Sequence, residues 1–148
     1  MDQKSYLRYW GEQYRADLVE NILPFWLTHG LDREHGGIYT ALDRDGRLMD
    51  SDKSIWFQGR FAFVCAFAYN HVERKPEWLE AAKTTLDFIE RYGTDTDGHM
   101  FFEVTADGRP VRKRRYLFSE CFAAIALSEY AIATGDKACG AKALELFE

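Results

Sequence analysis

A repeat of 62 positions is the feature that most constrains the fold of this 148-residue chain. The tripeptide Asp-Gly-Arg occurs at 45–47 and again at 107–109. The same offset relates four further pairs: Gly36 with Gly98, Tyr39 with Phe101, Trp26 with Phe88, and Gln58 with Glu120. Each unit combines an amphipathic outer helix, a loop with a hairpin, and an apolar inner helix. Such units cannot bury their apolar faces alone, so they stack on their neighbours. The pattern therefore predicts the start of an all-α array of helical hairpins, whose third unit is interrupted.

Apolar spacing and turn residues predict where these elements lie. Residues 5–27 show the three-to-four spacing of an amphipathic helix, and Pro24 should kink its last turn. Asp-Gly turns predict two short hairpins, and residues 54–72 are apolar on nearly all sides, which predicts a buried helix. The predicted elements after residue 27 are, in order: a hairpin over 38–50, helices over 54–72 and 77–92, a hairpin over 98–112, a helix over 117–134 and a helix from about 136.

Composition excludes several classes of function. The chain is 47% apolar and 16% aromatic, which is enough to build a sizeable core. A net charge of −5 argues against nucleic-acid binding, and the one basic run, Arg112–Arg115, is interpreted as solvated surface. No apolar window is long enough to span a membrane, and no secretory leader is visible. The three cysteines Cys65, Cys121 and Cys139 fall in helical patterns, so we expect buried, reduced thiols and a cytoplasmic protein.

Arg60 is the one charged residue within the apolar segment Ile55–Tyr69. A guanidinium stays charged at any ordinary pH, and an apolar interior does not tolerate a charge without a partner. Arg60 should therefore meet a carboxylate, a group of backbone carbonyls, or a ligand that develops negative charge. The residues alone leave open whether this is a structural ion pair or a functional site.

Three segments resemble the N-terminal part of the N-acylglucosamine 2-epimerase family, which includes cellobiose 2-epimerases and mannose isomerases. They are GLDREHGGIYTALDRDGR, DKSIWFQGRFAF and RRYLFSECFAAIALSEYAIATGD. The aromatic-Gln-Gly-Arg and Phe-Ser-Glu-Cys-Phe motifs occur in the family's order and spacing. The resemblance implies an (α/α)6 barrel with short β-hairpins in its loops. Residues 1–148 would then be the N-terminal part of a single barrel domain, holding two repeats and the start of a third.

The resemblance also implies a chemistry, cofactor-independent epimerisation at C2 of a sugar. Removing the C2 proton leaves an enediolate oxyanion, which needs a fixed cation or donor, and an acid/base group is needed on each face. By resemblance, Arg60 contacts the carbonyl oxygen and stabilises the enediolate, and the acid/base groups are histidines beyond position 148. An aldose–ketose isomerase of the same family stays open, as does a non-catalytic helical-toroid binding protein.

Five further residues are candidates for sugar binding. Aromatic walls against a sugar could come from Tyr39, Trp56 and Phe118, although such residues also serve as plain core. Gln58 and Glu120 occupy equivalent places near the starts of the inner helices, where Glu120 could equally be a cap or an ion-pair partner. The Phe-Ser-Glu-Cys-Phe form is closer to the N-acylglucosamine branch. It favours a monosaccharide, N-acylglucosamine or N-acylmannosamine.

The sequence carries no cofactor signature. The four histidines lack the spacing of a zinc site, the aspartates at 43–52 do not follow a calcium loop, and we expect no metal. No Gly-rich phosphate loop is present, so a nucleotide effector, which the family resemblance alone suggests, would need another kind of site. The expected partner is a small-molecule sugar, and a homodimer of the full-length protein stays open.

Overall fold

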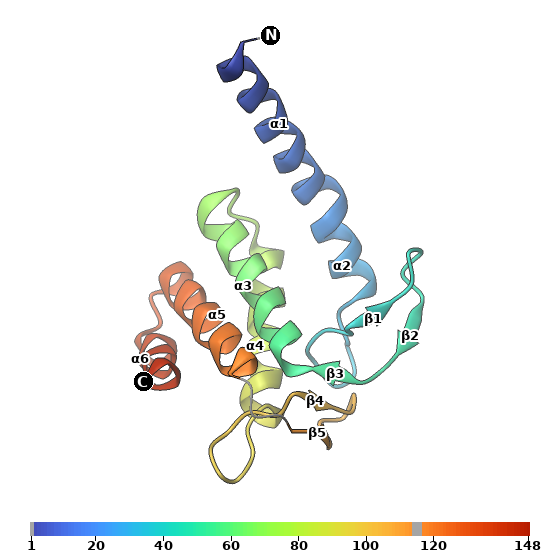
Figure 1. Ribbon diagram of the computed structural model, residues 1–148, viewed down its shortest axis with the longest axis vertical. Helices are drawn as coiled ribbons and strands as arrows, with labels where there is room; N and C mark the ends of the chain where they lie inside the picture. The colour runs from blue at the N-terminus through green and yellow to red at the C-terminus, as the bar shows by residue number, and fades with distance from the viewer. Residues whose placement is uncertain (1, 114–116) are drawn as a thin grey trace.

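The computed structural model describes residues 2–113 and 117–148 as a set of helices with two small sheets (Figure 1). The helices are α1 (Gln3–Asp17), the π-helical segment η1 (Leu18–Ile22), α2 (Leu23–His29), α3 (Ile55–His71), α4 (Pro76–Tyr92), α5 (Phe118–Thr134) and α6 (Lys137–Phe147). The strands are β1 (Ala41–Leu42), β2 (Leu48–Asp50), β3 (Lys53–Ser54), β4 (Glu103–Val104) and β5 (Pro110–Arg112). No described helix is both long and apolar enough to cross a membrane.

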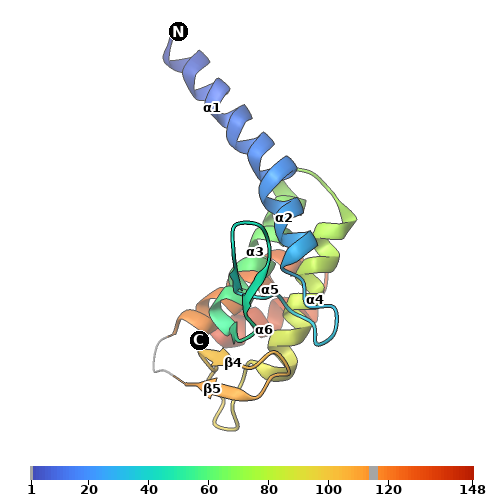
Figure 2. The ribbon, with the colours of Figure 1, turned by 90° about the vertical axis from the view of Figure 1, so that its right-hand side faces the viewer.

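The inner helices α3 and α5 form the centre of the molecule. They lie side by side, and α4 and α6 pack outside them (Figures 1 and 2). Small residues line the contact, among them Gly59, Ala62 and Ala123, so the two helix backbones approach closely. Larger apolar side chains such as Trp78 and Ile55 fill the rest of the core. The repeated pattern of outer and inner helices thus confirms the helical-hairpin prediction.

The first predicted helix is continuous but contains a wide turn before Pro24. Proline has no N–H, and its ring would clash with the carbonyl four residues earlier in a regular α-helix. The π-helical turn, in which the Leu23 N–H donates to the Leu18 carbonyl, precedes the proline and relieves this conflict. The helix α1 buries no residue and extends away from the body (Figures 1 and 2).

The prediction that residues 54–72 are buried on nearly all sides is wrong for one face of α3. Ile55 and Ala62 are fully buried, whereas Arg60 and Phe67 are exposed. One face of α5 is also open, with Ile132 65% exposed. Apolar character therefore covers the whole circumference of both helices, but in the described chain only part of it meets a neighbour.

Both hairpins follow the predicted Asp-Gly turns. Gly46 has φ +85° and Gly108 has φ +88°, values that a side chain would make costly. The strands β1 and β2 form one antiparallel pair, whereas β3, β4 and β5 form a three-stranded sheet. Because β3 leads directly into α3, this sheet connects the second hairpin to the start of the first inner helix.

The cysteines all lie in helices, but they are not equally buried. Cys65 is buried in the core, Cys139 is half-buried, and Cys121 is exposed on the open face of α5. The expectation that all three are buried is therefore wrong for Cys121, because helical position alone did not reveal which face would be open.

This difference predicts an order of thiol labelling. Burial raises the pKa of the Cys65 thiol from 9.0 to about 12. That leaves about 10³-fold less of the reactive thiolate at pH 8. Burial, and next Asp136, also raise the pKa of Cys139. Timed alkylation followed by mass spectrometry should modify Cys121 first, Cys139 more slowly and Cys65 only upon unfolding. Early modification of Cys65 in folded protein would contradict the packing.

Candidate functional site

The predicted site residues gather at the hairpin end of the inner helix pair. Both α3 and α5 begin at this end (Figure 1). Trp56, Gln58 and Arg60 lie in the first turns of α3, and Phe118 and Glu120 lie in the first turn of α5. Tyr39 lies in the loop before β1, where its N–H donates to the Gly30 carbonyl. The structure thus brings the starts of both inner helices and the loop that carries Tyr39 to one end of the molecule.

Arg60 lies on the open face of α3 rather than in an apolar interior. Its guanidinium carbon is 4.8 Å from the centre of the Trp56 ring and 5.0 Å from that of the Phe57 ring. Within residues 2–113 and 117–148, no carboxylate forms an ion pair with it. Contact with aromatic faces holds a guanidinium without using its N–H groups. Arg60 is therefore oriented by its neighbours while its donors remain available to an oxygen-bearing ligand.

Gln58 has both ends of its side chain committed to the loop. It is fully buried, its Oε1 accepts from the Ile38 N–H at 2.7 Å, and its Nε2 donates to the Ile38 carbonyl at 2.6 Å. Gly37 leaves room for this contact, since a Cβ there would lie 2.7 Å from Gln58 Oε1. Gln58 therefore fixes the residue before Tyr39, and in this arrangement it offers no free polar atom to a sugar.

Glu120 makes only half of the equivalent contact. Its Oε1 accepts from the Met100 N–H at 2.9 Å, and Met100 stands 62 positions after Ile38. Its Oε2 is buried and has no hydrogen-bond partner among the described residues. The indole Nε1 of Trp56 is likewise buried without a partner. At the site end, Glu120 Oε2 is therefore an unused acceptor and Trp56 Nε1 an unused donor, and each could be satisfied by a hydroxyl group or a water molecule.

Replacing Glu120 with glutamine should raise stability. By analogy with Gln58, the new amide N–H could donate to the Met100 carbonyl, and one added hydrogen bond contributes about 0.5–1.5 kcal/mol. Urea unfolding of Glu120→Gln should therefore show a higher midpoint, whereas the exposed control Glu80→Gln should show little change. A lower midpoint for Glu120→Gln would mean that the carboxylate makes a stabilising contact beyond Met100.

The aromatic candidates are distributed over different surroundings. Trp56 packs against Phe57 and Phe122, with ring centres 6.0 Å apart in each pair. Phe118 is 60% exposed, and Tyr39 is half-buried near Lys53. Burial, and next the negative charge of Asp32, raise the pKa of Tyr39. Trp56 is thus the candidate most closely associated with Arg60, and Phe122 belongs to the same aromatic wall, although the sequence interpretation did not include it.

Sequence reasoning also missed a buried ion pair between Lys53 and Asp32. The side chains are 0% and 1% exposed, and Lys53 Nζ lies 2.6 Å from Asp32 Oδ2. Burial alone would raise the pKa of Asp32, but hydrogen bonds from Lys53 and from two backbone N–H groups outweigh it and lower that pKa. A lysine beside the apolar start of α3 was the available signal, but its partner is 21 positions away in the sequence.

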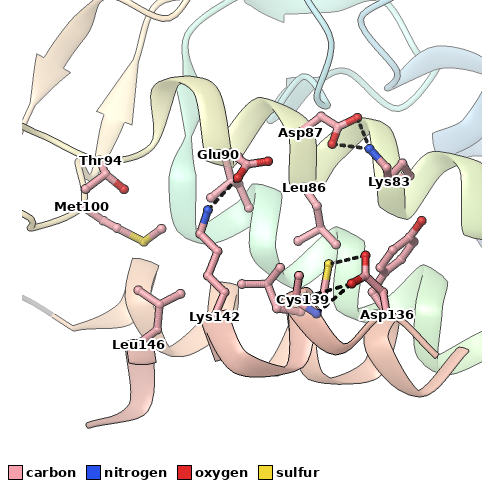
Figure 3. Close-up of a pocket in the computed structure, with 14 residues that line it drawn as sticks. Lys83, Leu86, Asp87, Glu90, Thr94, Met100, Asp136, Cys139, Lys142 and Leu146 are labelled. Atoms are coloured by element: carbon pink, nitrogen blue, oxygen red, sulfur yellow. Dashed lines mark hydrogen bonds and ion pairs between the residues drawn. The ribbon is translucent and has the colours of Figure 1, made fainter. Parts of the chain in front are cut away.

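A cavity of about 250 Å³ lies between α4, α5 and α6, away from these residues (Figure 3). Lys142 reaches across it to Glu90 at 2.9 Å, and Lys83 pairs with Asp87 at its edge. None of the six predicted site residues lines it. The cavity is therefore distinct from the candidate sugar site, which is an open surface at the hairpin end.

Two sequence predictions concern charged groups elsewhere. Arg112 is exposed at the end of β5, while Arg114 and Arg115 lie outside the described residues. The described parts of the chain hold no group of three or more His, Cys, Asp or Glu side chains suited to a metal ion.

Comparisons with known proteins give a consistent family likeness. Residues 36–148 match the family model described as N-acylglucosamine 2-epimerase. The chain is 37% identical to N-acylglucosamine 2-epimerase from Bos taurus over 99% of this chain and 35% of that protein. It is 32% identical to cellobiose 2-epimerase from Eubacterium cellulosolvens over 84% of this chain and 31% of that protein. The chain therefore spans about a third of the length of these relatives.

Solved structures agree on the fold. Cellobiose 2-epimerase from Spirochaeta thermophila matches with a TM-score of 0.86 and 30% identity over 97% of this chain and 35% of that chain. A D-mannose isomerase matches with a TM-score of 0.79 at 19% identity, over 91% of this chain and 34% of that one, which is evidence for the fold alone. The likeness confirms the (α/α)6-barrel class, of which these residues form the N-terminal part.

Proposed function

Because this chain belongs to the N-acylglucosamine 2-epimerase family, we propose that the protein carrying it is a cofactor-independent sugar 2-epimerase. The observation that carries the proposal is the placement of Arg60. Its guanidinium stacks on Trp56 and Phe57 at the hairpin end and forms no ion pair with a described carboxylate. A held cation with free donors is what an enediolate oxygen requires.

The chemistry assigns a limited task to this part of the protein. The sugar carbonyl makes the C2 proton removable, so the proposed reaction needs no cofactor, but it does need a proton acceptor and a proton donor. Arg60 would bind the carbonyl oxygen and the enediolate that replaces it. The proton-transfer groups, by family resemblance two histidines, are proposed to lie beyond residue 148. The unused Glu120 Oε2 and Trp56 Nε1 could each bind a sugar hydroxyl, which both donates and accepts.

We propose N-acylglucosamine and N-acylmannosamine as the substrate pair. The mammalian N-acylglucosamine 2-epimerases are 34–37% identical over 99% of this chain, whereas the cellobiose 2-epimerases are 27–32% identical over a smaller share. We also propose a cytoplasmic location, which the three free cysteines support, since such thiols persist in reducing compartments.

The proposal is tested by following C2 proton exchange in deuterated water. Protein produced from the whole gene is incubated with N-acetylglucosamine, N-acetylmannosamine, glucose, mannose and cellobiose, and NMR follows loss of the C2 proton and the products formed. We expect exchange and C2 epimers with the two N-acetyl sugars. A ketose product would identify an isomerase instead, and a folded protein without exchange on any of these sugars would contradict the proposed function.

A further inference from the structure

Lys53 is a fully buried lysine with every ammonium proton in use. Its Nζ donates to Asp32 Oδ2 at 2.6 Å, to the Gly36 carbonyl at 2.8 Å and to the Ala106 carbonyl at 3.1 Å. An ammonium group has three N–H donors, so these three acceptors satisfy it completely. The Phe88 ring centre lies 4.4 Å from the same nitrogen. We call this arrangement of Lys53 with its three acceptors the Lys53 clasp.

The clasp joins segments from both repeats. Asp32 and Gly36 belong to the loop that follows α2, and Asp32 Oδ1 orders that loop by accepting from the N–H groups of Glu34 and His35. Ala106 lies 53 positions beyond Lys53, at the turn of the second hairpin. One side chain therefore holds the first-repeat loop against the second-repeat hairpin.

Fold stability alone is a weak reason for this arrangement. Burying two charges carries a large desolvation penalty, and replacing such a pair with apolar side chains is often neutral or stabilising. Burial accordingly lowers the pKa of Lys53, although the hydrogen bond and charge of Asp32 oppose that effect. A buried ion pair can instead specify one geometry among several, because its hydrogen bonds are directional.

The segments that the clasp fixes carry candidate site residues. Tyr39 follows the clasped loop, and its ring centre lies 5.2 Å from Lys53 Nζ. On the other side, α3 begins two residues after Lys53 and carries Trp56 and Arg60 in its first turns. The Ile55 N–H donates to the Phe102 carbonyl, which attaches the start of this helix to the second hairpin.

We propose that Lys53 is a positioning residue for the sugar site: through Asp32, Gly36 and Ala106 it holds the Tyr39 loop in register with the start of α3 and the second hairpin. This inference rests on the proposed function. Lys53 itself is sealed from solvent and does not touch substrate. Its effect passes through the Tyr39 loop, whereas the start of α3 keeps its own hydrogen bond from the Ile55 N–H to the Phe102 carbonyl, so loss of Lys53 should weaken sugar binding more than it slows the chemical step.

The test uses Lys53→Met in protein produced from the whole gene, with Lys83→Met as the control. Lys83 also pairs with an aspartate, Asp87, but both side chains are about half exposed, at the edge of the cavity beside α4. A mutation that removes ground-state binding raises KM and leaves kcat nearly unchanged, so we expect KM for the sugar to rise about tenfold in Lys53→Met while kcat changes less than about threefold. The control should keep both constants. Measurements are made well below the melting temperature of each variant.

A second readout does not depend on activity. The Gly36 N–H donates to the Asp32 carbonyl and the Gly108 N–H donates to the Thr105 carbonyl, so both amides report on the clasped turns. Hydrogen exchange at both should accelerate in Lys53→Met, while amides within α4 keep their protection. Should Lys53→Met fail to fold, the double variant Asp32→Asn with Lys53→Met removes both charges and should show the same rise in KM.

The outcomes separate the two proposals. A lower melting temperature with unchanged KM would show that Lys53 is merely structural and would overturn the inference, as would unchanged exchange at Gly36 and Gly108. If the wild-type protein exchanges no sugar proton, the proposed function fails, and the amide measurements alone then decide whether the clasp orders these turns.

Discussion

Replacing Arg60 with alanine is expected to lower turnover by about 10²–10³-fold, which corresponds to about 3–4 kcal/mol of lost transition-state stabilisation. The expected loss is large because an enediolate develops negative charge at one oxygen. A cation already held at that place stabilises the charge without any rearrangement of the protein during the reaction. Lysine keeps the charge but loses the planar fork that lies on Trp56 and Phe57. Turnover should therefore fall from the wild type to Arg60→Lys and again to Arg60→Ala.

Paired measurements of C2 proton exchange and thermal unfolding distinguish this role from a structural one. Because Arg60 is exposed, its removal should change the melting temperature little. Arg91→Ala is the matched control, since this arginine also lies near an aromatic ring, 5.7 Å from the centre of Tyr92, but on the outer helix α4. Undiminished exchange in folded Arg60→Ala would remove Arg60 from the mechanism.

The internal repeat made much of the fold predictable from sequence. Asp-Gly turns specify hairpins because glycine adopts positive φ without a steric penalty, and both turns form where they were predicted. The offset of 62 also relates equivalent contacts: Gln58 binds the Ile38 backbone, and Glu120 binds the Met100 backbone. The pairing of Gln58 with Glu120 in the sequence was thus a signal of shared structure.

The exposed helix faces and the Lys53 clasp could not be predicted from the sequence, because they depend on contacts between residues far apart in the chain. Apolar composition indicated that α3 could be buried on all sides, but it could not show that the α3 face carrying Arg60 would be open. Nor could it show that Cys121 on α5 would be exposed. The Lys53 clasp needs partners 21, 17 and 53 positions away, and no local pattern connects them. Likewise, the π-helical turn satisfies the constraint of Pro24, whereas the sequence predicted only a kink.

The contact between α3 and α5 leaves no room for a side chain at Gly59, the middle residue of Gln-Gly-Arg. A Cβ added there would lie 2.7 Å from the Phe122 carbonyl carbon and 2.8 Å from the Ala123 nitrogen. These are backbone atoms of a packed helix and cannot rotate away, so the two helices would have to separate. Overpacking of this kind costs about 1–3 kcal/mol or more, which exceeds the gain of about 1 kcal/mol that alanine brings to a helix interior.

Gly59→Ala should therefore lower the free energy of unfolding by about 1–3 kcal/mol, and Gly59→Val should lower it further. Gly11 offers the matched control, because it also lies within a helix but has no atom within 4 Å of the added Cβ. Gly11→Ala should instead stabilise by about 0.5–1 kcal/mol through helix propensity alone. Urea unfolding of the three variants measures both the loss of stability expected at Gly59 and the gain expected at Gly11. If Gly59→Ala were as stabilising as Gly11→Ala, the inner helices could not pack as closely as the structure shows.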